Sequence, residues 1–288
     1  MNSIVQFFED IPRIPISEWT EATVKFITKT FSFVFNPIQE HFGNFMDFTS
    51  DKLSLIPVPI FIVILGVIAF FITGRRFGLA TFAVIGLWLI YNQELWDHFI
   101  NTFTLVIMAS LLSVIVGVPI GILMSKSRVA EVIITPILDF MQTMPAFVYL
   151  IPAVAFFGIG MVPGVFASFI FATPPTVRLT NLGIRQVSEE LVEASESFGS
   201  TGAQKLFKVE LPMAKSTIMA GINQTVMLAL SMVVIASMIG ARGLGREVLS
   251  ALQRSDVGPG FVAGIGIVIL AILIDRFTQS LQADDEEN

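Results

Sequence analysis

The stretch EELVEASESFGSTGAQKLFKVELP, residues 189–212, is a polar segment flanked by hydrophobic runs. Ser188 before it is a predicted N-cap, and Glu189 and Glu190 place negative charge in a first helical turn, where the helix dipole favours it. Gly199 suits a C′ position with a positive φ, and Pro212 is expected to end a second helical stretch. The segment therefore predicts two short helices around a turn, with an ordinary amphipathic loop helix as the alternative.

Composition places this segment in a membrane protein. Hydrophobic residues make up 54% of the 288 residues and charged residues only 14%, which is too apolar for a soluble domain. The net charge of −6 owes much to the acidic residues 284–287, within a predicted solvated tail at 281–288, and no nucleic-acid partner is expected. No charged segment followed by an apolar one begins the chain, so no cleaved signal peptide is evident.

Metal and catalytic chemistry are poorly supported by the residues. The chain has no cysteine, and His41 and His98 are its two histidines, so a zinc centre or a catalytic triad is not expected. No G-x4-G-K-[ST] sequence occurs, so this chain is not expected to hydrolyse ATP by the P-loop route. We therefore expect a membrane protein that is not itself an enzyme.

Charge-free runs predict the membrane spans, since a helix needs about 20 apolar residues to cross the hydrocarbon. The run 140–177 is far longer than one crossing needs, and Gly158-Ile159-Gly160 with Pro163-Gly164 predicts a reversal within it. Seven crossings follow: a two-span hairpin at residues 55–93 and a five-span core at residues 94–280. The runs are 53–74, 77–93, 99–125, 140–177, 216–241 and 257–274.

Basic residues near the span ends predict the orientation. Alternation of the spans puts most of them on one side, which is therefore the predicted cytoplasmic side, with the C-terminus inside and residues 1–54 outside. Arg242, Arg246 and Arg254 fall in a predicted external loop, against this rule. The basic residues on the predicted cytoplasmic side are Arg75, Arg76, Lys126, Arg128, Arg185, Lys205, Lys208 and Lys215.

The N-terminal segment, residues 1–54, alternates apolar and charged residues in a way that predicts an amphipathic helix. Such a helix would lie on the outer membrane face or pack against the outer surface of the protein itself, and the sequence leaves both open. The apolar residues are Trp19, Val24, Phe26, Ile27, Phe31, Val34 and Phe35.

The spacing of the polar segment carries a resemblance to a known family. Its residues run E-A-S, three residues, G, nine residues, V-x-L-P, which resembles the E-A-A-x3-G-x9-I-x-L-P signature of ABC importer permeases. Ser195 and Val209 are the two departures from that signature. The resemblance implies that residues 185–215 form a cytoplasmic loop that docks on an ATPase subunit. The docking residues it implies are Glu193, Ala194, Ser195, Gly199, Val209, Leu211 and Pro212.

Three further segments, 138–165, 171–187 and 220–245, look like permeases of glycine betaine/proline betaine uptake systems. The resemblance covers nearly all of residues 95–280 and is weakest before residue 55. It implies an all-α type I ABC importer permease in the plasma membrane of a prokaryote, working as a pair that we expect to be a homodimer. An external substrate-binding protein would supply a small zwitterionic solute, and ATP and Mg would bind the partner ATPase, with no cofactor in this chain.

The translocation path is predicted from polar residues inside spans, which need partners or water. The alternative is that such side chains bond back to their own helix or to a neighbouring one. Asp139 is expected to cap a helix or to pair with Lys126 or Arg128, and Thr225 and Ser237 are further polar candidates. The path candidates are Gln142, Thr143, Phe147, Tyr149, Phe156, Asn223, Gln224 and Ser231.

Several other residues are expected to be structural. Trp88, Tyr91 and Trp96 predict an interfacial belt, and Asp275-Arg276 predicts a snorkelling pair near the end of the last span. Three glycine pairs match the close-approach pattern of membrane helices. They are Gly117-x3-Gly121, Gly160-x3-Gly164 and Gly260-x3-Gly264.

Several alternatives of function remain at this point. Carnitine or choline could replace glycine betaine as the solute. An ATP-independent osmolyte channel or a secondary transporter would need neither the polar loop nor a partner. An intramembrane enzyme is disfavoured because no credible catalytic group is present.

Overall fold

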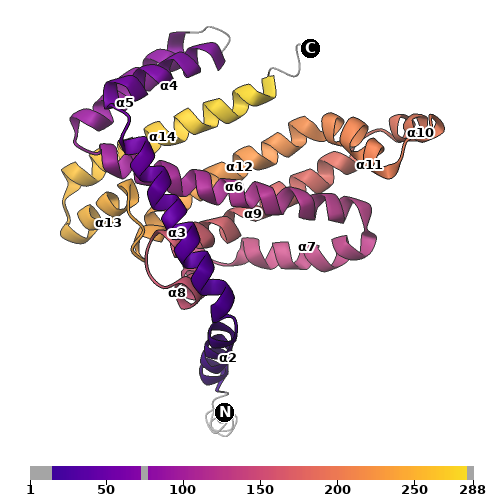
Figure 1. Ribbon diagram of the computed structural model, residues 1–288, viewed down its shortest axis with the longest axis horizontal. Helices are drawn as coiled ribbons and strands as arrows, with labels where there is room; N and C mark the ends of the chain where they lie inside the picture. Colours follow the sequence, from indigo (N-terminus) through magenta and orange to yellow (C-terminus); the bar gives the residue numbers. More distant parts are fainter. Residues whose placement is uncertain (1–14, 73–76, 284–288) are drawn as a thin grey trace, which may run out of the picture.

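The computed structural model describes residues 15–72 and 77–283, which form helices and short connections (Figure 1). The all-α class predicted from the sequence is confirmed for these residues. Arg75, Arg76 and the acidic residues 284–287 lie outside the described residues. The principal helices are α2 (Ile16–Thr30), α3 (Ser32–Ser54), α4 (Val58–Ile72), α5 (Phe77–Asn92), α6 (Trp96–Lys126), α7 (Arg128–Thr143), α8 (Leu150–Phe157), α9 (Met161–Arg185), α10 (Glu189–Ser197), α12 (Leu211–Ser237), α13 (Leu244–Arg254) and α14 (Val257–Ala283).

Three helical segments of the described chain are long and apolar enough to cross a membrane: Trp96–Lys126, Gly202–Ser237 and Val257–Ser280. Two bent pairs raise this number to five if each pair forms one span. They are α3 with α4, bent by 95°, and α7 with the segment Ala146–Phe157, bent by 109°. Seven crossings therefore stay a prediction, while a membrane protein with several spans is established.

The bend after α7 corrects the prediction for the run 140–177. The first half of that run is not one straight crossing, because α7 begins at Arg128 and ends at Thr143 before the chain turns into the 3-10 helix Ala146–Tyr149. Pro145 is the cause: a proline disfavours helical backbone in the residue before it, and Met144 is extended with ψ of 132°.

The reversal predicted within the same run is present between α8 and α9. Gly158 and Gly160 have φ of 72° and 140°, which a residue with a side chain rarely adopts. Pro163 and Gly164 do not belong to the turn. They lie in the first turn of α9, where proline is tolerated because the N–H it lacks has no helical partner there.

The core is built around α9, which packs between α6 and α12 (Figure 1). A Cβ added at Gly121 of α6 would lie 2.6 Å from the Cβ of Thr180 on α9, so the predicted close approach is confirmed at this pair. On the α12 side, the hydroxyls of Thr176 and Thr225 are 2.7 Å apart. At Gly264, by contrast, an added Cβ would meet nothing within 4 Å.

The N-terminal helix α3 packs against the protein itself, across the N-terminal parts of α6 and α9 (Figure 1). Met46 is buried there, Ser50 Oγ donates to Thr104 Oγ1 at 3.1 Å, and the rings of Phe35 and Phe156 stack with centroids 4.9 Å apart. Helix α2 buries no residue and leaves Trp19 exposed. The second alternative from the sequence therefore holds for α3.

Trp96 does not belong to the predicted interfacial belt. Its ring is buried against Phe99, with centroids 5.5 Å apart, and edge-on against Phe61 at 5.2 Å. Trp88 and Tyr91 are exposed, as a belt requires. The difference arises because Trp96 begins α6 and is covered by α4, a contact that sequence spacing does not reveal.

Candidate functional site

The polar segment forms two short helices around a turn at one end of the bundle (Figure 1). We call residues 186–210 the coupling loop: it contains α10, the turn at Gly199, α11 (Gly202–Lys205) and a π-helical turn, Leu206–Glu210. Gly199 has φ of 77°, and Ser188 occupies the N-cap position of α10 without a side-chain hydrogen bond. The local structure predicted for this segment is thus confirmed up to its second helix.

A capping box that sequence reasoning missed begins this second helix. Thr201 Oγ1 accepts from the backbone N–H of Gln204 at 3.3 Å, and the Gln204 side chain accepts from the backbone N–H of Thr201 at 2.9 Å. Thr201-x-x-Gln204 fits the S/T-x-x-E/Q pattern of a capping box, so the signal was present in the sequence.

The prediction that Pro212 ends the second helix is wrong. The chain is helical from Gly202 to Ser237, and Pro212 lies in the first turn of α12. A proline removes one backbone donor and crowds the preceding turn, and the π-helical turn Leu206–Glu210 directly before it absorbs this defect. As a result, the coupling loop is continuous with a membrane-length helix.

The coupling loop presents an apolar side chain at its tip. Phe198 is 92% exposed, immediately before Gly199, and Leu191 of α10 is exposed as well. Glu193 and Ala194 are also exposed, while Ser195 is half-buried and donates to the carbonyl of Val192 at 2.8 Å. Phe207 of the π-helical turn is 66% exposed, so exposed apolar side chains occur in both halves of the loop.

Two ion pairs hold the coupling loop. Lys126 at the end of α6 pairs with Glu210, whose side chain is 5% exposed. Within the loop, Lys205 Nζ lies 2.5 Å from Glu196 Oε1. The hydrogen bond from Lys205, and then its positive charge, hold the pKa of Glu196 below its usual value, so this second pair is intact at neutral pH.

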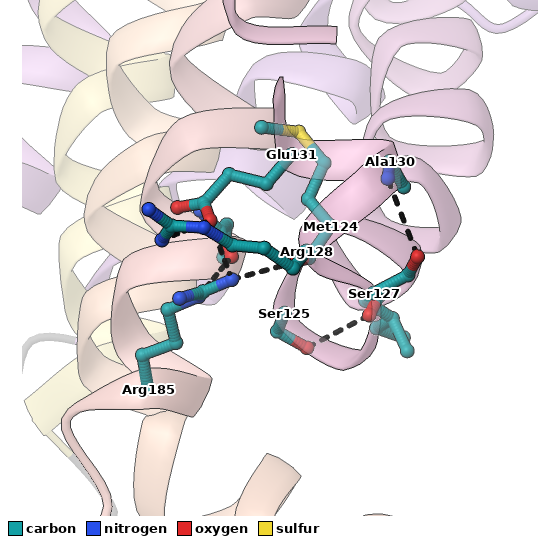
Figure 2. A network of polar contacts seen from close by, with 9 residues as sticks. Met124, Ser125, Ser127, Arg128, Ala130, Glu131 and Arg185 are labelled. Carbon is teal, nitrogen blue, oxygen red and sulfur yellow. Dashed lines mark hydrogen bonds and ion pairs between the residues drawn. The ribbon is translucent and has the colours of Figure 1, made fainter. Parts of the chain in front are cut away.

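A polar cluster lies at the base of the loop, where α6, α7 and α9 end or begin (Figure 2). Arg185 Nη2 donates to Glu131 Oε2 at 2.9 Å and to the carbonyl of Met124 at 3.0 Å, and Arg128 donates to the same Glu131 oxygen at 3.0 Å. Ser127 caps α7 by accepting from Ala130 N at 3.2 Å. Arg185 thus joins the end of α9 to α6 and to α7, just before the loop begins.

The path candidates fall into two groups, of which the first is exposed. Gln142 and Gln224 make no hydrogen bond within the part of the chain that the structure describes. Thr143 and Ser231 donate to carbonyls of their own helices, as the alternative from the sequence anticipated. Phe147 is exposed in the 3-10 helix that follows α7.

The side chains of the second group make contacts inside the protein. The Tyr149 ring is buried against Phe171, and its hydroxyl donates to the carbonyl of Met141. Phe156 stacks on α3, as described above. Thr225 and Ser237 are buried and bonded to backbone carbonyls. These side chains are packing or interhelical residues in this structure.

Asn223 belongs to a polar cluster between α12 and α14. Its Nδ2 donates to Asp275 Oδ1 at 3.0 Å, and its Oδ1 accepts from Thr278 Oγ1 at 2.6 Å. Gln279 also donates to Asp275, at 2.8 and 2.9 Å. Asp275 is therefore satisfied by neutral donors, one from α12 and one from its own helix, and does not form the pair with Arg276 that the sequence predicted.

Asp139 pairs with Arg178 of α9, and not with Lys126 or Arg128 as predicted. The distance along the chain hides this partner, because α7 and α9 meet only after the reversal at Gly158–Gly160. The feature of the sequence that could have pointed to Arg178 is its position as a cation directly after the apolar run 140–177. Within residues 15–72 and 77–283, no group of three carboxylate or imidazole side chains could hold a metal ion.

The fold is an all-helical bundle with membrane-length helices and a polar helical loop at one end, which is the architecture of a membrane protein with several spans. Residues 117–284 match the family model described as "Binding-protein-dependent transport system inner membrane component", and the chain belongs to this family. It is therefore a multi-pass inner-membrane permease. Membership implies two kinds of partner, a substrate-binding protein and an ATPase subunit.

Relatives of similar length share high identity with the chain. The glycine betaine/carnitine transport permease protein GbuB of Listeria monocytogenes is 59% identical over 94% of this chain and 96% of its own. The glycine betaine transport system permease protein OpuAB of Bacillus subtilis is 51% identical, with the same coverage. The glycine betaine/proline betaine permease ProW of Escherichia coli is 46% identical over 94% of this chain and 76% of its own.

Among solved structures, the inward-facing MetNI methionine ABC transporter is similar in fold. One of its chains superimposes with a TM-score of 0.60 at 18% identity, covering 64% of this chain and 93% of that chain. This likeness supports the all-helical permease fold.

Proposed function

We propose that this chain is the permease subunit of an ATP-driven importer of glycine betaine and related zwitterions, and that the coupling loop transmits the force of ATP hydrolysis. The observation that best supports this proposal is the coupling loop itself, with Phe198 exposed at its tip and its second helix continuous with α12. The identity of the solute is inferred from the names of the relatives. Carnitine is the second candidate, because the relative at 59% identity is named for both solutes.

The contacts of the loop suggest how movement would pass into the membrane. An ATPase that displaces α10 would act on α12 through the continuous helix, on α6 through the Lys126–Glu210 pair and on α7 and α9 through Arg185. Four helices, α6, α7, α9 and α12, are thus joined to the coupling loop. ATP binding would bring two loops together and open a cavity outward, and hydrolysis would reset it.

The remaining features of the proposal concern assembly and orientation. Two copies would pair as a homodimer with five core spans each, and the path would run between them along the exposed side chains Gln142, Thr143, Phe147, Gln224 and Ser231. Tyr149, Phe156 and Asn223 are left out of this path because their side chains are already engaged. The C-terminus and the coupling loop would be cytoplasmic, and α2 would be external.

Gly199→Val tests the docking role. Valine at a φ of 77° costs about 1–2 kcal/mol in a left-handed conformation, while an added Cβ would meet nothing within 4 Å, so the strain is confined to the turn. ATP-driven uptake in vesicles containing the permease, its ATPase and its binding protein should fall, while the purified permease keeps its melting temperature. Gly202→Val is the matched control, since this glycine also has open space but no positive φ. Equal uptake by the two variants would refute the docking role.

Cysteine labelling tests the proposed orientation. The chain has no cysteine, so Ser17→Cys on α2 and Ser197→Cys on α10 give two exposed single-thiol variants on a clean background. A membrane-impermeant maleimide applied to intact cells should label the thiol at position 17 and should label that at position 197 only after the membrane is opened. Labelling of position 197 from outside would reverse the orientation.

A further inference from the structure

Arg178 and Asp139 form an ion pair between α9 and α7, and they directly flank the two ends of the apolar run 140–177. Arg178 lies about two helical turns before Arg185 in α9, and Asp139 about two turns after Glu131 in α7. The side chains are 36% and 60% exposed, respectively. Charges within membrane-spanning segments usually face a bundle interior or a water-filled cavity, and they commonly mark the path of a solute.

The surroundings of Arg178 place it on an uncovered strip of α9. One face of α9 packs on α6 through Thr176 and Thr180, and the neighbouring face packs on α12 through Leu179. Arg178 lies on the side of the helix away from these contacts, and Leu182, one turn further, is exposed as well. The strip is therefore bordered by α7 on one side and by α12 on the other.

Two exposed amides lie on the helices that flank this strip, α7 and α12. Gln142 lies one turn beyond Asp139 on α7, and Gln224 lies one turn beyond Gly221, the residue of α12 that faces Leu179. Neither amide makes a hydrogen bond among the described residues, as noted above. Arg178 Nε is also buried without a hydrogen-bond partner. The two amides are exposed and can bond to water, whereas the buried Arg178 Nε is a donor that a bound water or solute would satisfy.

We propose that Arg178 and Asp139 form a binding site for the transported zwitterion, an assignment that rests on the function proposed above. The Arg178 guanidinium would hold the carboxylate of the solute by paired N–H donors, which its planar fork suits. Asp139 would face the quaternary ammonium, which has no N–H and is attracted through its charge alone. Gln142 and Gln224 would supply neutral donors along the path.

The charges balance when such a solute binds. The internal pair separates, and each member then faces the opposite charge of the zwitterion, so no unpaired charge is left in the bundle. A purely anionic solute would leave Asp139 unpaired, and a purely cationic one would leave Arg178 unpaired. The pair is 36% and 60% exposed, so an unpaired charge costs less here than in a dry core, but the site still favours zwitterions over singly charged solutes.

A structural clamp between α7 and α9 is the competing explanation of this pair. That role is already filled two turns away by Arg185 and Glu131, where the carboxylate is only 22% exposed and is shared with Arg128. Asp139 is far more exposed and binds one cation. The two explanations differ in what happens when both charges are removed together.

The test uses the double variant Asp139→Asn/Arg178→Gln in vesicles that hold the complete transporter with its ATPase and binding protein. Radiolabelled glycine betaine uptake and ATP hydrolysis are measured together. We expect uptake to fall at least about tenfold while ATP hydrolysis stimulated by the loaded binding protein persists, so that more ATP is consumed per solute. The matched control is Glu21→Gln/Lys25→Gln, which removes an exposed ion pair on α2 and should leave both rates unchanged.

Each other outcome has a defined meaning. If the double variant transports at the wild-type rate, or if uptake and hydrolysis fall in proportion because it no longer assembles, the pair is structural and the site proposal is overturned. Arg178→Lys keeps the charge without the fork and should retain part of the uptake. A wild-type transporter that takes up no quaternary-amine zwitterion overturns the proposed function as well, so the two failures are distinguishable.

Discussion

Gly121→Val should prevent the permease from reaching a stable fold. An added Cβ would lie 2.6 Å from the Thr180 Cβ and 2.7 Å from the backbone carbonyl oxygen of Val177. Overfilling a core costs about 1–3 kcal/mol even where side chains can shift, and here a backbone atom stands in the way, so α6 and α9 must separate. That separation would also break the contact of Gly117 with Thr176, because both glycines lie on one face of α6.

Size-exclusion chromatography and thermal melting of the detergent-purified protein would measure this effect. We expect Gly121→Val to aggregate or to melt well below the wild type. Gly264→Val in α14 is the matched control, since an added Cβ there has open space. A Gly121→Val protein with the melting temperature of the control would contradict the packing of α6 on α9.

Lys126→Met should uncouple transport by leaving Glu210 without its partner. Breaking a fully buried ion pair costs about 3–5 kcal/mol, because the remaining charge is stranded. Glu210 is 4% exposed, but the Lys126 side chain is 39% exposed, so screening by water reduces the loss to about 2 kcal/mol. We expect the π-helical turn that holds Glu210 to rearrange and the attached coupling loop to lose its position.

The measurement is the number of solutes imported per ATP hydrolysed by the reconstituted transporter. Lys126→Met should lower this number, and Lys126→Met/Glu210→Met should regain melting temperature without regaining transport. Lys29→Met removes an exposed lysine that pairs with no carboxylate among the described residues, and it should behave as the wild type. Unchanged coupling in Lys126→Met would show that the loop is not held through α6.

Features set by local sequence were predictable. The turn at Gly199 and the reversal at Gly158–Gly160 follow from glycine conformational freedom, and both have the expected positive φ. The close approach at Gly121 follows from a pattern of small residues on one helix face. The capping box at Thr201 was equally local and could have been found from the same kind of pattern.

Features set by contacts between distant segments were not predictable from spacing. Asp139 pairs with Arg178, Asn223 bonds to Asp275, and Trp96 is covered by Phe61 of α4, and each partner lies at least 35 residues away along the chain. Pro212 was misjudged for a different reason. A proline within an apolar helix normally signals an end, but a π-helical turn directly before it keeps this helix continuous.

The helix that runs unbroken from Gly202 to Ser237 sets a mechanical scale for the transporter. Its 36 residues span about 54 Å at 1.5 Å per residue, so a tilt of roughly 5° about one end moves the other by about 5 Å. That displacement approaches the width of a small solute. On the proposed coupling, a slight rocking of this helix, driven at the membrane surface, would therefore suffice to change access without a large rearrangement within the permease.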